Sequence, residues 1–189
     1  MTQCFVAGTV SGSGLVGGLV GVNDGVVNQC YSEGEAIGLG YVGGLIGYNR
    51  WGMICTSYSQ ASVNGGYPVG GLTGSNGSTI TQCYSTGKVS GDGDGVGGFA
   101  GYNYISGNDS ISSSFRDIET SGQMISTGDA IGMNTIEMQT ATTFLDAGWD
   151  FVNETTNGTE DIWWILEGQD YPRLWWELPG EDGAELDAN

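Results

Sequence analysis

The chain has 189 residues, of which 36 are glycine and three are proline, and 14% are charged. Aromatic residues make up 11% and hydrophobic residues 39% of the chain, which excludes a collagen-like or disordered protein because there is apolar surface to bury. The net charge of −18 excludes nucleic acid as a partner, and the absence of histidine excludes Ser-His-Asp catalysis and histidine-ligated zinc.

Two short blocks recur along the first two thirds of the chain at steps of mostly 26 or 27 residues. The first is Val-Gly-Gly, then Leu or Phe, a variable residue and Gly, and its copies are Val16–Gly21, Val42–Gly47, Val69–Gly74 and Val96–Gly101. The second is Cys or Ser followed by an aromatic residue, and its copies are Cys4-Phe5, Cys30-Tyr31, Ser57-Tyr58, Cys83-Tyr84 and a degenerate Ser114-Phe115. A fixed period of this length indicates a repeat fold in which each unit stacks on its neighbours.

Each unit contains three short stretches with β-type patterns, separated by Gly, Asn, Asp or Ser turns and without a helical pattern between them. The size of the unit suits one turn of a parallel β-solenoid, whose coils stack about 4.8 Å apart. We therefore predict an all-β fold, a parallel β-solenoid (β-helix) of about five coils over residues 1–134.

An asparagine follows two residues after the last glycine of each block, and again after Gly132: Asn23, Asn49, Asn76, Asn103 and Asn134. Coils stacked in register would place these side chains in one column, where each amide can bond the next coil and satisfy backbone groups at a bend. We predict a structural asparagine ladder.

The cysteine positions leave the disulfide state open. Cys4, Cys30 and Cys83 share one position of the repeat, and Cys55 lies near Ser57, which fills that position in the third unit. Stacked neighbours fall within disulfide range, but the offset of Cys55 disfavours two bridges, so we interpret all four as free thiols that act as small hydrophobic side chains.

The aromatic residue after each Cys or Ser must face the opposite side of an extended strand. These residues are Phe5, Tyr31, Tyr58, Tyr84 and Phe115. We expect them to stack on one another or lie in the core. The alternative is an exposed stripe on which sugar rings could lie.

The segment 90–95 is rich in glycine and acidic residues. Asp92 and Asp94 make it a weak calcium candidate, because calcium requires six to eight oxygen ligands, and a solvated turn is the alternative. We expect no other metal and no cofactor. The scattered acidic and basic residues of the repeats nominate no catalytic residue.

The composition changes near residues 116 to 134. Sixteen acidic and two basic residues, together with five of the six tryptophans, lie in residues 116–189. Residues Thr135 to Ala147 predict one short helix, and three short strands are expected around Trp149, Ile162 to Leu166 and Arg173 to Trp176.

A solenoid needs a terminal cap to cover its last coil. We predict a Trp-rich cap over residues 135–178, which could form a final irregular coil, and an acidic tail or linker over 179–189. In the pairs Trp163-Trp164 and Trp175-Trp176, one ring of each must face away from the core if the segment is extended. Trp51, Trp164 and Trp175 are therefore our candidates for glycan or subunit contact, with packing inside the cap as the alternative.

The first residues align with the interior of a repeat, since Met1 to Phe5 match Ile80 to Tyr84. One interpretation is that the chain is a fragment of a longer surface protein. The other is that its first coil receives another subunit, which gives head-to-tail assembly into open filaments.

The four successive blocks resemble the bacterial GLUG-motif repeats, named for Gly-Leu-any-Gly, over about residues 1 to 134. The fourth block departs from the pattern at Phe99 and Ala100, and a fifth keeps only Gly132-Met133-Asn134. The family occurs in surface and secreted bacterial proteins, including filamentous-haemagglutinin-like adhesins. The resemblance implies a fold and a surface and does not imply a reaction.

These observations predict an extracellular structural or adhesion module, located in the secreted fraction or at the cell surface, which contacts cell-surface glycans or proteins. The first alternative is the subunit of a head-to-tail extracellular filament, and the second is a carbohydrate-active β-helix enzyme, which we do not favour. No apolar run reaches the roughly 18 residues of a membrane helix, so we expect no membrane insertion.

Overall fold

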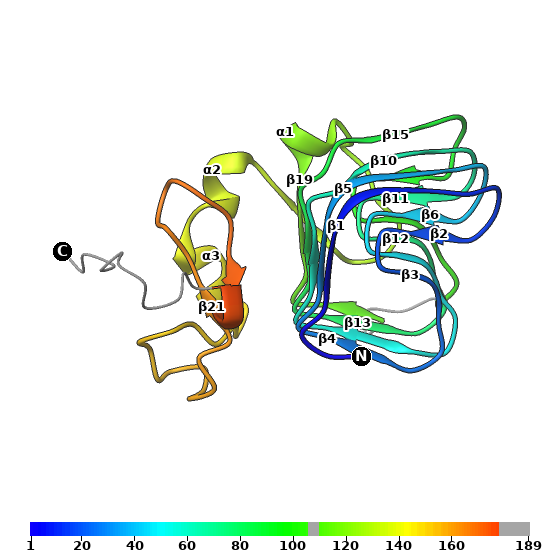
Figure 1. Ribbon diagram of the computed structural model, residues 1–189. Coiled ribbons are helices and arrows are strands. Elements are labelled where there is room, and N and C mark those ends of the chain that lie inside the picture. Colours follow the sequence, from blue (N-terminus) through cyan, green and yellow to red (C-terminus); the bar gives the residue numbers. More distant parts are fainter. Residues whose placement is uncertain (106–109, 178–189) are drawn as a thin grey trace. The chain divides into compact units, whose positions relative to one another are not determined.

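A computed structural model describes residues 1–105 and 110–177 of the chain (Figure 1). The predicted acidic tail, 179–189, lies outside the described residues. The chain divides into two compact units, Met1–Met138 and Gln139–Asn189.

The first unit is a parallel β-solenoid, as predicted. Its first sheet has eight strands, of which β1, β5, β10 and β15 lie beside one another in chain order (Figure 1). The strands of this sheet are β1 (Phe5–Ser11), β5 (Tyr31–Gly38), β9 (Tyr58–Ser59), β10 (Ser62–Gly65), β14 (Tyr84–Ser85), β15 (Val89–Gly91), β19 (Phe115–Asp117) and β20 (Ile131–Met133).

Three further sheets of four strands complete the walls of the solenoid. The second contains β2 (Val16–Gly17), β6 (Val42–Gly43), β11 (Val69–Gly70) and β16 (Val96–Gly97). The third contains β3 (Val20–Asn23), β7 (Ile46–Asn49), β12 (Thr73–Asn76) and β17 (Ala100–Asn103). The fourth contains β4 (Val26–Asn28), β8 (Met53–Cys55), β13 (Thr79–Thr81) and β18 (Ile111–Ser112).

Each full coil therefore crosses four sheets, and the expectation of three strands per unit was wrong. The glycine-rich block is the reason, because it holds two strands instead of one. In the second coil, Val42–Gly43 pairs in the second sheet, the chain bends at Gly44 and Leu45, and Ile46–Asn49 pairs in the third.

Equivalent residues of successive coils pair without slippage. Val42 pairs with Val16 on one side and with Val69 on the other, and Asn49 pairs in the same way with Asn23 and Asn76. All strand pairs of this unit are parallel. This register produces the columns that the sequence period predicted, so equivalent side chains of successive coils lie above one another.

The glycines of the repeated block allow two walls to approach each other. A Cβ atom on Gly44 would overlap the carbonyl oxygen of Gly71 and the hydroxyl of Ser59. Ser32 is buried in the same column as Ser59, and its hydroxyl donates a hydrogen bond to the carbonyl of Gly44 at 2.8 Å. Small residues are thus needed on both walls at this level.

The interior on either side of this contact is aliphatic. One cluster is built on Leu45, Ile46, Ile54, Leu72 and Ile80 and also contains Cys30 and Cys83. A second cluster lies between the first and second sheets and contains Ala36, Val63 and Val89 of the first with Val16, Val42 and Val69 of the second. Burying such side chains contributes about 1.5–3 kcal/mol each, so both clusters stabilise the solenoid.

A shortened fifth turn closes the C-terminal end of the solenoid. After β19, helix α1 (Ile118–Ser121) begins, capped by the buried carboxylate of Asp117, which accepts hydrogen bonds from the backbone N–H groups of Glu119 and Thr120. The chain then runs beside the fourth coil, where the N–H of Gly98 donates to the carbonyl of Ile125 at 2.9 Å. It returns to the first sheet as β20.

Arg116 fills the interior of this last turn. Its position in the first sheet is held by Val6 in the first coil and by serine in the next three, the last of which, Ser85, pairs with Arg116. The guanidinium donates to the carbonyl oxygens of Ala130 and Met124, both in the closing segment. Burial lowers the pKa of this arginine.

The fifth asparagine, Asn134, does not join the predicted ladder. It follows β20, whose Gly132 pairs with Arg116 in the first sheet, whereas the other asparagines lie in the third sheet. Its side-chain oxygen accepts from the N–H of Glu137, and the Glu137 carboxylate accepts from the N–H of Asn134. This reciprocal pair caps helix α2 (Thr135–Met138).

The single helix predicted over 135–147 is two short helices. Helix α2 ends at Met138 and belongs to the first unit, whereas α3 (Ala141–Leu145) belongs to the second. Thr140 between them is extended, with φ −119° and ψ 119°, which interrupts the helix. A continuous apolar pattern does not reveal such a break.

The second unit has its own core, in which Phe144, Trp149, Phe151 and Trp163 are buried. Strands β21 (Trp163–Trp164) and β22 (Arg173–Leu174) pair antiparallel, so this segment is not a further parallel coil. No strand forms at Trp149. Trp175 and Trp176 lie in the 3-10 helix η1 (Trp175–Glu177), so the strand alternation assumed for that pair does not apply.

Candidate functional site

Four of the five predicted asparagines form a hydrogen-bonded column in the third sheet. The Nδ2 of Asn23 donates to the Oδ1 of Asn49 at 2.9 Å, Asn49 donates to Asn76 at 2.8 Å, and Asn76 donates to Asn103 at 3.0 Å. The Asn103 amide ends the column on the carbonyl of Ile105 and the hydroxyl of Ser110. Because every amide is used inside the protein, this column is structural.

The four cysteines are free thiols. Cys30 and Cys83 are buried in the aliphatic cluster, with Cys4 packed against it. Where the column holds Ser57, the hydroxyl accepts from the N–H of Cys30 at 3.0 Å. Burial raises the pKa of the Cys30, Cys55 and Cys83 thiols, which keeps them protonated and unreactive.

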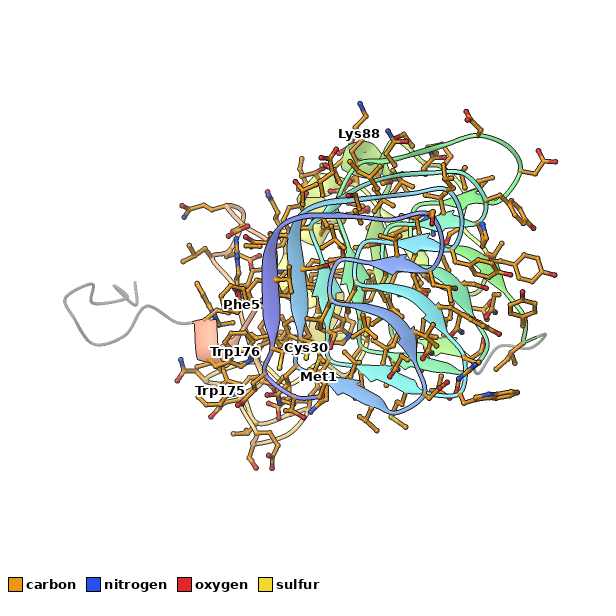
Figure 2. All side chains as sticks on the ribbon, turned by 45° about the vertical axis from the view of Figure 1, so that its right-hand side comes forward. Met1, Phe5, Cys30, Lys88, Trp175 and Trp176 are labelled. Atoms are coloured by element: carbon orange, nitrogen blue, oxygen red, sulfur yellow. The ribbon has the colours of Figure 1, made fainter. Side chains whose placement is uncertain are left out.

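The aromatic residues that follow each Cys or Ser in the repeat stack on one another along the first sheet. The ring centroids of Phe5 and Tyr31 are 5.1 Å apart, those of Tyr31 and Tyr58 are 4.9 Å apart, and those of Tyr58 and Tyr84 are 4.8 Å apart. Phe5, on the outside of the first coil in Figure 2, is 55% exposed, whereas Tyr58 and Tyr84 are fully buried. A ligand therefore has little access to most of this column.

The calcium candidates Asp92 and Asp94 are exposed in the turn after β15. Within residues 1–105 and 110–177, no group of three or more His, Cys, Asp or Glu side chains lies close enough to hold a metal ion. The two carboxylates by themselves supply too few ligands for calcium.

The three predicted contact tryptophans do not share one unit. Trp51 is 75% exposed in the loop between β7 and β8 of the solenoid. Trp164 and Trp175 belong to the second unit, where the indole N–H of Trp164 donates to the carbonyl of Leu174 at 3.0 Å and Trp175 is 43% exposed.

The solenoid also carries a group of tyrosines that the sequence analysis missed. Tyr48 and Tyr102 lie on β7 and β17 of the third sheet, Tyr104 follows β17, and Tyr41 directly precedes β6 of the second sheet. Ring centroids are 5.6 Å apart for Tyr41 and Tyr48, 5.9 Å for Tyr48 and Tyr104, and 4.7 Å for Tyr102 and Tyr104. We call these four residues the tyrosine cluster.

The tyrosine cluster is open to solvent at one side. Tyr102 is 39% and Tyr104 is 52% exposed, while Tyr41 and Tyr48 are partly buried. A hydrogen bond with Tyr41, together with partial burial, raises the pKa of Tyr104. The one sequence signal for the cluster is the Gly-Tyr-Asn triplet that occurs in the second and fourth units, at residues 47–49 and 101–103.

A charged pair lies at the same corner of the coil as Tyr104. The N–H groups of Arg50, Gly77 and Tyr104 each donate to the carbonyl of the ladder asparagine one coil earlier, so these residues occupy one column. The guanidinium of Arg50 forms an exposed ion pair with Asp24 of the first coil. This ion pair lowers the pKa of Asp24 and raises that of Arg50.

Across the described ranges, no helix is long and apolar enough to pass through a membrane. The tyrosine cluster and the ion pair lie on the outer surface of the coils, whereas the asparagine ladder is buried in their wall. The outer surface offers aromatic faces and hydroxyl groups.

Comparisons with known proteins agree with the repeat pattern. The family model for the GLUG motif matches residues 65–90, which contain the third block. A protein of Evansella cellulosilytica, whose name describes it as a Gly-rich membrane protein, is 38% identical over 112 residues, which is 57% of this chain and 12% of that protein. The chain thus spans a small part of that relative, and no solved structure matches it. The family model thus matches one GLUG motif, and blocks of the same pattern recur in register in four stacked coils of this chain.

Proposed function

We propose that this chain is a structural and adhesive module at the cell surface, in which a stack of coils presents an aromatic surface for contact with glycans or cell-surface proteins. The observation that carries the proposal is the tyrosine cluster on the outer wall, two of whose rings are more than a third exposed. Exposed aromatic groups of this kind are typical of binding surfaces.

The architecture supports this role. Each coil is tied to the next by parallel strand pairs and by the asparagine column, which keeps the outer side chains of successive coils at a fixed spacing. The relative that is named a membrane protein is much longer than this chain, which suits a module carried within a larger surface protein.

A glycan array with the purified chain tests the proposal. We expect reproducible binding to a subset of glycans, retained in about 0.5 M salt because the contacts are aromatic instead of ionic. The same labelled chain should bind intact cells that display the glycan. Absence of binding both to the array and to cells would contradict the adhesive role.

A second candidate is head-to-tail assembly through the first coil. Phe5, Leu15 and Val26 of this coil are each about half exposed, and a hollow lined by residues of 6–21 has a volume of about 550 Å³. Apolar surface at the end of a stack can accept a further coil, either from a longer chain or from a second copy. Filaments that appear in electron micrographs as the concentration rises would favour the second copy.

We propose no catalytic role. The surface acids are dispersed, and Asp24, one of them, is already paired with Arg50. Turnover of an acidic polysaccharide by the purified chain, measured by release of reducing ends, would contradict this part of the proposal.

A further inference from the structure

We infer that the tyrosine cluster, Tyr41, Tyr48, Tyr102 and Tyr104, is the binding site of this module and that its ligand is a neutral glycan chain. The inference rests on the proposed adhesive function and gives that function a location and a ligand class. It also moves the expected site away from Trp51, Trp164 and Trp175.

The cluster exists because the third coil carries small residues where the second and fourth carry rings. Tyr48 and Tyr102 lie in one column, separated by Ser75, whose side chain is fully buried. Gly77 occupies the corner below Tyr104, and a Cβ atom there would lie 3.5 Å from the Tyr48 hydroxyl. The ring of Tyr104 can therefore lean past the third coil and contact Tyr48.

The repeats provide an internal control that separates fold from function. A residue that every coil needs recurs in every coil, as the asparagines of the ladder do. The tyrosines do not recur in this way. The column of Tyr48 contains Val22, Ser75 and Tyr102, and the corner of Tyr104 is occupied by Asp24, Arg50 and Gly77 in the other coils.

The backbone of Tyr41 is strained, and the fold of the solenoid does not require this strain. Its φ of 51° lies in the left-handed region, where a side chain other than glycine is strained. The residue in the same position before the second-sheet strand is Leu15, Pro68 or Gly95 in the other coils. The strain at Tyr41 brings its ring to Tyr48 and its hydroxyl to Tyr104.

The chemistry of the cluster suits a sugar. Aromatic faces pack against the C–H faces of a pyranose ring, and phenol hydroxyls both donate and accept hydrogen bonds with sugar hydroxyls. A mostly apolar surface with a few oriented polar groups is the usual composition of a small-ligand site. The rings span the second to fourth coils, a distance of about 10 Å at 4.8 Å per coil, which accommodates two linked sugars.

Charge selects a neutral ligand. The four tyrosines carry no charge at neutral pH, and the charged groups at their corner, Arg50 and Asp24, neutralise each other. The chain as a whole has a net charge of −18, which repels acidic polysaccharides. A neutral oligosaccharide binds without this cost.

Affinity gel electrophoresis and calorimetry on the full chain test the inference. The neutral probes are hydroxyethylcellulose, soluble amylose, mannan and dextran in the gel, with cellohexaose, maltohexaose and mannohexaose for calorimetry. Polygalacturonate is the acidic probe. We expect at least one neutral probe to bind and the acidic probe not to bind.

Three variants locate the site. Tyr102→Ala and Tyr104→Ala should each weaken binding by about tenfold or more, the effect expected when an aromatic contact with the ligand is lost. Tyr67→Ala is the matched control, because Tyr67 is 54% exposed on the same unit and makes no ring contact with the cluster among the described side chains. It should bind as the parent chain does, and all three variants should keep the circular dichroism spectrum of the parent.

The outcomes separate the site from the function. Glycan binding that survives in both cluster variants would overturn the site and leave the adhesive function standing. Failure of the parent chain to bind any glycan or cell would overturn both. A dimer in light scattering that Tyr104→Ala converts to a monomer, without glycan binding, would show that the cluster joins two copies of this chain and would also overturn the inference.

Discussion

Asn49 shows how one side chain can connect three coils. Its amide donates to Asn76 and accepts from Asn23, and its backbone carbonyl accepts from the N–H of Gly77 in the next coil. The side chain is fully buried, so water cannot replace these bonds. Removing one member of the column leaves its neighbours with unpaired polar atoms.

Asn76→Ala should lower the free energy of unfolding by about 1–3 kcal/mol, because the Oδ1 of Asn103 and the Nδ2 of Asn49 lose a partner in a buried site. Urea denaturation followed by circular dichroism measures this change. Asn64→Ala is the control, since Asn64 is exposed on β10 and its replacement should change stability by less than about 0.5 kcal/mol. Equal effects of the two substitutions would contradict a role for the ladder.

The buried thiol of Cys83 should make stability fall at alkaline pH. Burial raises the pKa of Cys83 in the native protein, whereas a thiol in the unfolded chain titrates near 8.5. The free energy of unfolding therefore receives the full contribution of the protonated Cys83 thiol below about pH 8.5. It decreases as the pH rises toward the native pKa, by up to about 1.4 kcal/mol per pH unit.

Urea denaturation of the parent chain and of Cys83→Ser across pH 8 to 10 tests this expectation. Serine fits the column, because Ser57 and Ser114 hold the equivalent positions in other coils. The variant should lose stability less steeply than the parent. The same alkaline slope in both proteins would show that other groups are responsible.

At the scale of elements, the end of the solenoid depends on one arginine. Arg116 connects β19 to the closing segment through the carbonyl oxygens of Ala130 and Met124. In the second and fourth coils the residue at this position, Ser32 or Ser85, donates a hydrogen bond across the interior to a glycine carbonyl, at 2.9 Å from Ser85 to Gly98. The longer side chain at position 116 reaches a segment that no longer follows the regular coil.

Arg116→Ala should destabilise the chain by about 1–3 kcal/mol, because two carbonyl oxygens lose their donor. Hydrogen exchange should accelerate within residues 124–133 and change little in the second coil. Arg50→Ala removes only an exposed ion pair and should change stability much less than Arg116→Ala does. Accelerated exchange spread evenly over all coils would contradict a local closing role.

The elements also show where local patterns reach their limit. The period located the regular coils, but it did not reveal that the block Val42–Gly47 contributes strands to two sheets, because that division is made by packing of neighbouring coils against glycine. The helix expected over 135–147 was split at Thr140, and the strand expected at Trp175 is a 3-10 helix. These segments do not repeat, so no stacking rule constrains them.

For the whole molecule, charge opposes stability. Most of the net charge of −18 comes from residues 116–189, which contain sixteen acidic and two basic residues. Like charges repel over a distance that salt shortens from about 30 Å at 0.01 M to about 3 Å at 1 M.

The melting temperature should therefore rise when sodium chloride is increased from about 20 mM to about 500 mM. A recovery of about 1 kcal/mol would correspond to roughly 2–4 °C for a chain of this size. Differential scanning calorimetry measures the shift. An unchanged or lower melting temperature would show that repulsion contributes little to the stability of the native state.

The candidate site was less predictable than the fold. The sequence pattern favoured tryptophans, but the indole N–H of Trp164 is bonded to Leu174, and Trp51 lies in a different unit from Trp164 and Trp175. The tyrosine cluster depends on Ser75 and Gly77 being small in one coil and on Tyr104 leaning across it. A repeat period cannot predict a contact that forms only because certain residues depart from the repeat.

By itself, the sequence determined the parallel solenoid, the length of its coils and the columns of asparagine, cysteine and aromatic residues, because a constant period forces equivalent residues into register. The tertiary structure decided the fourth strand of each coil, the place of Asn134 as a helix cap, the closing role of Arg116 and the tyrosine cluster. These features arise where the sequence departs from its repeat. At such positions the conformation depends on the space and the hydrogen-bond partners that the neighbouring coils provide.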